Sequence, residues 1–289
     1  MLQIFNDMKN LVRLSAIAAV ATLGLAACNN AGTEGNKSTA DSTKATPRAA
    51  VAIAKVGASP EFADAKLAMK PVTAEKVGKD SAKLTFNFDV KGYDLKAQTA
   101  DNSGKGCNNS DKGQHIHFIL DNAPYKALYE PKNEVTVANN TEHYLVCFLS
   151  RSYHESLKNK DAAVVLHFKV DEKGNYKKLE DPKTPMLFYS RPKGDYIGKD
   201  TANVLLDFYV MNTTLGADGY KVKAQIMNED LKIDTTVTIG TWESNFIQNL
   251  GTGKCKVMLT LLDKDGKAVE GPMTTATRSF NMTASEPMK

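Results

Sequence analysis

From about residue 64 to the end of the chain, hydrophobic and polar residues alternate in short stretches. These stretches are rich in Val, Ile, Leu, Phe and Thr and are separated by Gly, Asn, Asp or Lys, a pattern typical of β-strands with one buried face. The alternation predicts strands near 64–72, 82–90, 114–121, 124–129, 133–138, 143–150 and 162–170, and a second set near 185–190, 203–211, 220–227, 231–239, 254–262 and 273–282. Since no long segment has the period of an amphipathic helix, we expect an all-β protein.

The second set of strands repeats the first. Residues 67–95 align without a gap with 187–215, residues 113–120 align with 219–226, and residues 143–149 align with 254–260. Six or seven short strands in about 100–110 residues are typical of an immunoglobulin-like sandwich. The repeat therefore predicts two tandem immunoglobulin-like antiparallel β-sandwiches, the first over 59–175 and the second over 183–285.

The first 27 residues have the pattern of a secretory signal peptide. Lys9 and Arg13 precede an uncharged, mostly apolar run over residues 14–27, which is shorter than the roughly 20 residues that span a bilayer as a helix. The run ends in Leu25-Ala26-Ala27-Cys28, which resembles the bacterial lipobox. The resemblance implies cleavage before Cys28 and attachment of fatty acyl chains such as palmitate to this residue. Two or more acyl chains anchor a protein stably to a membrane.

These features predict a lipid-anchored protein of the bacterial cell envelope, outside the cytoplasm. Asn29 follows the lipobox cysteine, which is not the Asp-type signal for retention in the inner membrane, so the outer membrane is favoured. Residues 28–58 are rich in small and polar residues and contain no aromatic residue. Such a composition favours a flexible tether between the lipidated cysteine and the folded part.

Composition and charge exclude several classes of protein. Apolar residues make up 42% of the chain and charged residues 24%, which excludes a wholly disordered protein. The 37 Lys and Arg residues nearly balance the 33 Asp and Glu residues, so no strong positive field indicates binding to nucleic acid. The chain also lacks the Gly-x-Ser-x-Gly, His-Glu-x-x-His and phosphate-loop motifs, and we expect that it is not an enzyme.

All the histidines lie in the first repeat. They are His115, His117, His143, His154 and His167. On the strand predicted near 114–121, His115 and His117 alternate with Ile116 and Phe118. On the strand predicted near 143–150, Tyr144, Val146 and Phe148 are expected to face inward, so that His143 lies on the opposite face. The aligned positions of the second repeat are Lys221, Lys223 and Lys254, which predicts that this face is exposed to solvent.

The histidines suggest a metal site on that face. Imidazole is a common ligand of zinc and copper, and two His at positions i and i+2 of a strand share a face. If the strands are neighbours, His115, His117, His143 and the nearby loop residue His154 are candidate ligands for zinc or copper. The alternative is that an exposed strand accepts His where the other repeat has Lys.

The remaining cysteines leave their pairing open. With Cys28 lipidated, Cys107, Cys147 and Cys255 form an odd number. A Cys107–Cys147 disulfide, free thiols and metal ligation by Cys107 are all compatible with the sequence, and Cys255 is expected to be a buried core thiol.

Two segments carry a resemblance to a known family. Residues 113–125, GQHIHFILDNAPY, and residues 148–156, FLSRSYHES, resemble a lipoprotein family of Bacteroidota whose members are sometimes labelled phosphopeptide-binding. That label implies a forkhead-associated sandwich with a Ser-Arg-x-His loop, whereas here two residues separate Arg151 from His154. Arg151 and Tyr153 of this loop are the candidate ligand-binding residues.

Together these observations predict a non-catalytic, lipid-anchored envelope protein whose first sandwich binds a transition metal or a small ligand. The alternative is a structural or protein-interaction module without a small ligand. Its partner would be another envelope protein, and phosphopeptide binding belongs to this alternative.

Overall fold

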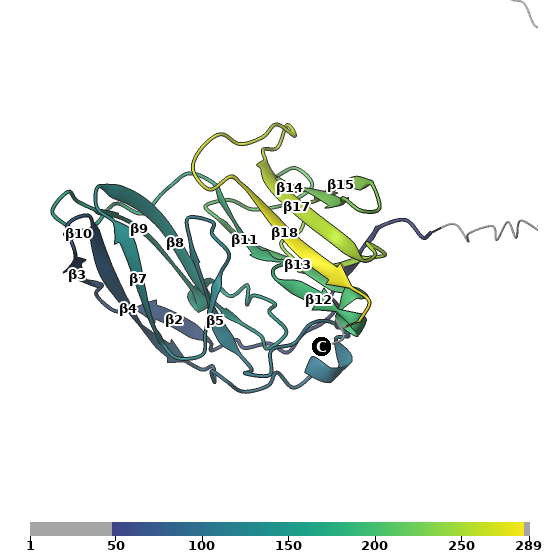
Figure 1. Ribbon diagram of the computed structural model, residues 1–289, viewed down its shortest axis with the longest axis horizontal. Coiled ribbons are helices and arrows are strands. Elements are labelled where there is room, and N and C mark those ends of the chain that lie inside the picture. The colour runs from purple at the N-terminus through teal and green to yellow at the C-terminus, as the bar shows by residue number, and fades with distance from the viewer. Residues whose placement is uncertain (1–47, 286–289) are drawn as a thin grey trace, which may run out of the picture. The chain divides into compact units, whose positions relative to one another are not determined.

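The computed structural model describes residues 48–285 of the chain (Figure 1). The predicted signal peptide, the predicted lipidation site Cys28 and most of the predicted tether lie outside these residues. Between residues 48 and 285 the helical segments are short 3₁₀ turns, η1 (Asn102–Gly104), η2 (Lys160–Ala162) and η3 (Gly198–Thr201). No helix in this part of the chain has the length and apolar character needed to cross a membrane.

The first sandwich consists of two antiparallel sheets. In one sheet, β4 (Ser81–Lys91) pairs with β2 (Lys66–Met69), β3 (Thr73–Val77) and β7 (Lys132–Ala138). The other sheet has the order β10 (Tyr176–Lys178), β9 (Ala163–Val170), β8 (Thr141–Ser150), β5 (His115–Leu120) and β6 (Lys126–Leu128). Buried side chains of both sheets, among them Phe86, Ile116 and Phe168, form the core between them.

The second sandwich repeats this arrangement, except that its edge strand β12 pairs with β18 in parallel. One sheet has the order β1 (Ala52–Lys55), β16 (Asn245–Gln248), β13 (Val204–Met211) and β11 (Met186–Arg191). The other has the order β12 (Asp195–Ile197), β18 (Thr275–Thr283), β17 (Gly253–Leu262), β14 (Lys221–Asn228) and β15 (Ile233–Ile239). The prediction of an all-β chain with tandem β-sandwiches is confirmed.

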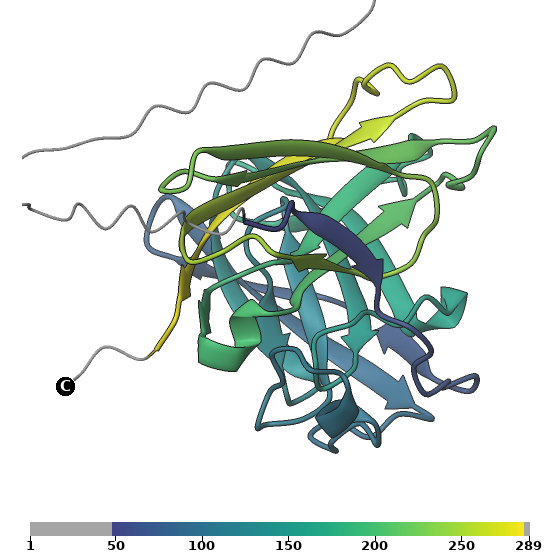
Figure 2. The same ribbon diagram turned by 90° about the vertical axis from the view of Figure 1, so that its right-hand side faces the viewer.

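Strand β1 lies within the segment that was predicted to be a flexible tether. Ala52 pairs with Gln248 and Lys55 pairs with Asn245, so that β1 extends the second sandwich before the chain enters the first (Figure 2). The small residues of this segment do not prevent pairing, because the backbone of β16 supplies the hydrogen bonds and Ile53 packs against the second core. The tether prediction is therefore wrong for residues 52–55.

The two sandwiches pack face to face. Ile119, Val146 and Phe148 of the five-stranded sheet of the first sandwich form one buried cluster with Phe188 and Tyr209 of the second. The rings of Phe148 and Tyr209 stack with their centroids 5.0 Å apart. Figure 1 shows β5 and β8 on the side of the first sandwich that faces β11 and β13. The two inner sheets are consequently buried on both faces where they meet.

This packing explains an apolar run that lacks alternation. Residues 204–210 of β13, VLLDFYV, are all buried. A near-continuous apolar sequence is typical of a strand that is covered on both sides. In contrast, β14 alternates between buried and half-buried residues, because one of its faces points away from the second core.

The structure also corrects the alignment of the two repeats at β8. Ile116 lies opposite Leu149, and the matching residue Val222 lies opposite Leu261. The equivalent of His143 is therefore Cys255, and the predicted match with Lys254 is wrong by one residue. Because side chains alternate along a strand, this shift inverts the faces of β8. His143 and Cys147 lie on the core side, whereas Val146 and Phe148 lie at the contact with the second sandwich.

Candidate metal centre

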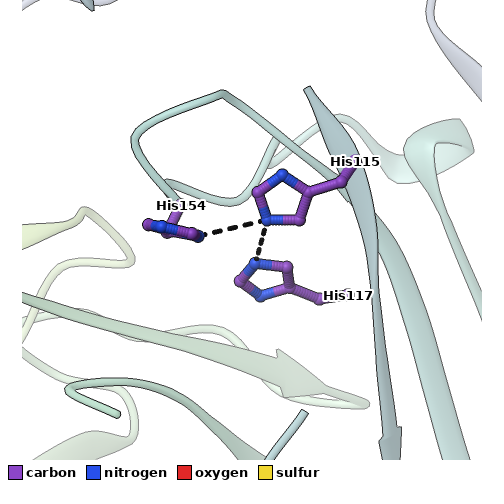
Figure 3. A group of neighbouring side chains, drawn as sticks. All are labelled: His115, His117 and His154. Atoms are coloured by element: carbon purple, nitrogen blue, oxygen red, sulfur yellow. Dashed lines mark hydrogen bonds between the residues drawn. The ribbon is translucent and has the colours of Figure 1, made fainter. Parts of the chain in front are cut away.

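Three of the predicted ligands come together between the two sandwiches (Figure 3). His115 and His117 project from the same face of β5, since their positions on the strand differ by two. His154 comes from the loop that follows β8, where the amide of His154 donates to the carbonyl of Arg151 and the residue adopts a φ of 70°. A tight turn thus directs the His154 ring back towards β5.

The ring nitrogens of these residues converge. His115 Nε2 lies 2.9 Å from His117 Nε2 and 3.1 Å from His154 Nδ1, and one nitrogen of each ring lies within 4.8 Å of the other two. Around a tetrahedral zinc ion with Zn–N bonds of 2.0–2.1 Å, neighbouring nitrogens are about 3.3 Å apart. The two distances from His115 Nε2 therefore need to lengthen by only a few tenths of an ångström to accept such an ion, and the third pair of nitrogens, those of His117 and His154, lies within 4.8 Å.

The cluster is buried, and this overturns the prediction of an exposed histidine face. The side chains of His115 and His117 are 0% exposed, and that of His154 is 7% exposed. The second sandwich covers this face of β5, and Tyr125 stacks on the His117 ring with centroids 3.7 Å apart. Lysine at the aligned positions of the second repeat misled the prediction, because the two repeats have different neighbours on this side.

Hydrogen bonds on the outer side of the cluster orient two of the rings. His115 Nδ1 donates to the carbonyl of Gly113 at 2.8 Å, which leaves Nε2 with its lone pair facing the other rings. His117 Nδ1 lies 3.0 Å from the hydroxyl of Ser190, a residue of β11 in the second sandwich. Metal-binding histidines typically have such a partner on the nitrogen that does not bind the metal.

Burial keeps the imidazoles neutral. Loss of solvation lowers the pKa of His115 to about 4, with a further contribution from the positive charges of Arg191 and Lys193, while the hydrogen bond to Gly113 acts in the opposite direction. Loss of solvation also holds the pKa of His117 and of His154 well below the ordinary value. At neutral pH the three rings therefore have the unprotonated form that binds metals.

The other two histidines lie outside this cluster. His143 Nδ1 is 2.6 Å from the Asp121 carboxylate, and the His143 ring packs against Phe168 on the core side of β8. The prediction that His143 shares a face with His115 and His117 was wrong, for the register reason given above. His167 lies on β9, where it stacks on Tyr144 and approaches Glu142 at 2.7 Å.

The loop residues predicted to bind a ligand have different environments. Arg151 binds the carbonyl of Pro60 at 2.6 Å and the carboxylate of Glu155 at 3.3 Å, and it lines a groove of about 720 Å³. Tyr153 is fully buried in a small cluster that includes Cys107 and Phe246. Tyr153 therefore packs between elements, whereas Arg151 borders the groove.

The three cysteines within residues 48–285 are free and lie outside the histidine cluster. Cys147 belongs to the core of the first sandwich, Cys107 to the cluster around Tyr153, and Cys255 to the core of the second sandwich, as predicted. Burial raises the pKa of the Cys107 thiol to about 12. Within residues 48–285, His115, His117 and His154 form the one group of His, Cys, Asp or Glu side chains with the spacing of a metal site.

The comparisons with known proteins give little about function. No family model matches the chain, and no curated protein matches it. Among solved structures, the fibronectin(III)-like modules of CbhA from Clostridium thermocellum are 9% identical, with a match that covers 76% of this chain and 98% of that chain at a TM-score of 0.26. A similarity of this size does not bear on function.

Proposed function

We propose that this protein is a non-catalytic, lipid-anchored cell-envelope protein that binds one zinc or copper ion through His115, His117 and His154. The observation that carries the proposal is that three buried imidazoles bring one nitrogen each to within 4.8 Å of the other two. Zinc and copper are the metals whose sites use imidazole most readily.

The burial of the cluster supports this proposal. A polar group that is removed from water is costly unless each donor and acceptor has a partner. Without a metal, His115 Nε2 is the single acceptor that faces nitrogens of both His117 and His154. A cation at the centre takes up one lone pair from each ring.

The position of the cluster suggests a structural role for the ion. His115 and His117 belong to β5, His154 belongs to the loop after β8, and His117 contacts Ser190 of the second sandwich. An ion bound by all three rings holds the loop against the sheet at the place where the sandwiches meet. Its binding energy then stabilises the packing of the two sandwiches, as with structural metals in general.

The location is proposed from the sequence. The lipobox-like segment before Cys28 supports an anchor in membrane lipid. Asn29, which follows Cys28, favours the outer membrane. Strand β1 begins 24 residues after Cys28, since Ala52 is its first residue. We expect the folded part to act outside the cytoplasm.

Metal analysis and calorimetric titration of the purified protein test the metal proposal. We expect one zinc or copper ion per chain, bound with a Kd far below millimolar. His115→Ala and His154→Ala should each weaken binding by more than the roughly 10–100-fold that loss of an outer hydrogen-bond partner causes. His167→Ala is the matched control, because His167 lies on the same sheet and outside the cluster. Binding no tighter than millimolar, or equal binding by the His115→Ala variant and the wild type, rejects the proposal.

A second candidate function is binding of an envelope protein in the groove beside the loop. The groove is lined by Phe62, Arg151, Lys158 and Trp242 together with acidic residues, and Arg151 Nε is buried there without a hydrogen-bond partner among the described residues. If the groove is an interaction site, Trp242→Ala should abolish capture of a partner while the metal content stays the same. Loss of capture on removal of the metal alone would argue against the groove.

A further inference from the structure

A tyrosine lies against the three imidazoles. Tyr125 precedes β6, and its side chain is buried between the two sandwiches. Its hydroxyl oxygen lies 3.2 Å from His154 Nδ1, and its ring stacks on His117 with an angle of 9° between the planes. The tyrosine oxygen thus extends the series of short donor distances, which are 2.9 and 3.1 Å between the imidazole nitrogens. All three distances are close to the spacing of about 3.3 Å between donors around a tetrahedral zinc ion.

His115 Nε2 is an acceptor with one lone pair, because its other nitrogen donates to Gly113, and it faces both His117 Nε2 and His154 Nδ1. When His117 donates to this lone pair, His154 Nδ1 accepts from the Tyr125 hydroxyl, and the lone pairs of His115 and His154 face each other across 3.1 Å. A cation at the centre binds the lone pairs that face one another, together with the Tyr125 oxygen.

Burial raises the pKa of the Tyr125 hydroxyl, and the positive charge of Arg191 acts in the opposite direction. Arg191 is buried, and no carboxylate among the described residues forms an ion pair with it. Its guanidinium donates to Tyr196 Oη and to the carbonyl of Lys193, while its Nε has no partner in this part of the chain. The Arg191 guanidinium lies 5.4 Å and the Lys193 ammonium 4.2 Å from the centre of the Tyr125 ring. A buried cation without a counter-charge is costly, and a phenolate at Tyr125 supplies one.

We propose that Tyr125 is the fourth ligand of this metal site and binds through its phenolate oxygen, an inference that rests on the proposed binding by the three histidines. On binding, the Tyr125 O–H bond breaks, its proton leaves to solvent, and a bond from the oxygen to the metal forms. There is no change of oxidation state. Arg191 is then a positioning residue that balances the charge of the phenolate.

This ligand changes the character of the site. Three histidines leave one position of a tetrahedral ion open for water or substrate, as in catalytic zinc sites, whereas a fourth protein ligand closes the coordination as in structural sites. The metal then joins β5, the segment before β6 and the loop after β8. A closed site agrees with a protein that is held together by its metal and does not use it for catalysis.

Copper(II) titration of the wild type, Tyr125→Phe and Tyr129→Phe tests this inference. Tyr129→Phe is the matched control, because Tyr129 also lies beside His115 but its hydroxyl bonds Ser110. We expect a visible tyrosinate-to-copper charge-transfer band and the Raman bands of a bound phenolate in the wild type and in Tyr129→Phe. Both signals should be absent in Tyr125→Phe, whose zinc affinity should fall by more than the roughly 10–100-fold that loss of an outer hydrogen-bond partner causes. Tyr125→Phe keeps the stacked ring and is expected to fold.

The outcomes separate this inference from the proposed function. If the wild type binds the metal and Tyr125→Phe gives the same spectrum and affinity, the three-histidine site stands and the ligand role of Tyr125 is wrong. If the wild type binds neither copper nor zinc, both proposals are wrong.

Discussion

The two sandwiches place different chemistry at the same position of the same fold. His115 and His117 on β5 correspond to Lys221 and Lys223 on β14, and both strands occupy the equivalent place in their five-stranded sheets. The two histidines are fully buried, whereas the two lysines are half-buried. The difference lies in what covers each sheet.

The second sandwich covers the outer face of the first sandwich's five-stranded sheet. Phe148 on β8 packs there against Tyr209, whereas the equivalent residue of β17, Thr260, is half-buried and bonds Thr275. A lysine ammonium needs water, while a neutral imidazole can be buried if its nitrogens have partners. The comparison shows that duplicated strands keep their core residues and change on the other face according to their neighbours.

Replacing the two histidines of β5 by lysine, the residue found in the second sandwich, should have the largest effect on stability and metal binding. The double variant His115→Lys/His117→Lys places two ammonium groups in the buried contact, where each uncompensated charge costs on the order of 3–5 kcal/mol. We expect loss of metal binding and a large loss of unfolding free energy, measured by urea denaturation with tryptophan fluorescence.

The reverse exchange is the matched control. Lys221→His/Lys223→His changes two half-buried residues and should alter the unfolding free energy by no more than about 0.5 kcal/mol. Equal effects of the two double variants would show that the two strands have the same environment, which contradicts the packing described above.

A smaller effect is expected from pH, and it should come from the first sandwich alone because this sandwich contains all the histidines. The pKa of His115 is about 4 in the folded chain and 6.5 ordinarily, so the unfolded chain binds the proton first as the pH falls. The stabilisation is complete above pH 6.5 and is lost as the pH falls towards 4, by about 3 kcal/mol from His115.

Urea denaturation of metal-free protein between pH 7 and pH 5 checks this sign. In this window the ordinary carboxylates remain largely ionised, so that the loss reports on the buried imidazoles. Bound zinc should raise the stability at pH 7 and lose this effect at lower pH, since protons compete for the ligands. A stability that stays constant or rises towards pH 5 would contradict neutral, buried rings.

The fold could be predicted because local pattern and duplication agree. The gapless match of 67–95 with 187–215 is confirmed by the pairing, since Leu67 lies opposite Val90 and Leu187 lies opposite Val210. Period-two alternation also gave the correct faces of β5 and β9, where one side of each strand is clearly apolar.

The site could be predicted only in part, because it depends on a contact between distant segments. The run Leu145-Val-Cys-Phe-Leu149 is apolar on both faces, so alternation cannot show which face is the core, and the wrong choice placed His143 with the cluster. Ser190 and Arg191 meet the imidazoles only after the sandwiches pack, and Tyr125 reaches them through the turn between β5 and β6; no spacing in the sequence indicates either contact. The pair His115 and His117 was found because both lie on one short strand.

The smallest expected effect tests the face of β8 directly. His143 occupies the position of Cys255, on the core side, where its two nitrogens bond Asp121 and Thr141. His143→Gln should therefore leave zinc affinity within about twofold of the wild type, a change below about 0.4 kcal/mol. The same substitution in the cluster, His117→Gln, should weaken zinc binding far more, because it removes a ligand nitrogen. Calorimetry of both variants decides the matter, and a loss of affinity in His143→Gln as large as that in His117→Gln would mean that the two residues share a face after all.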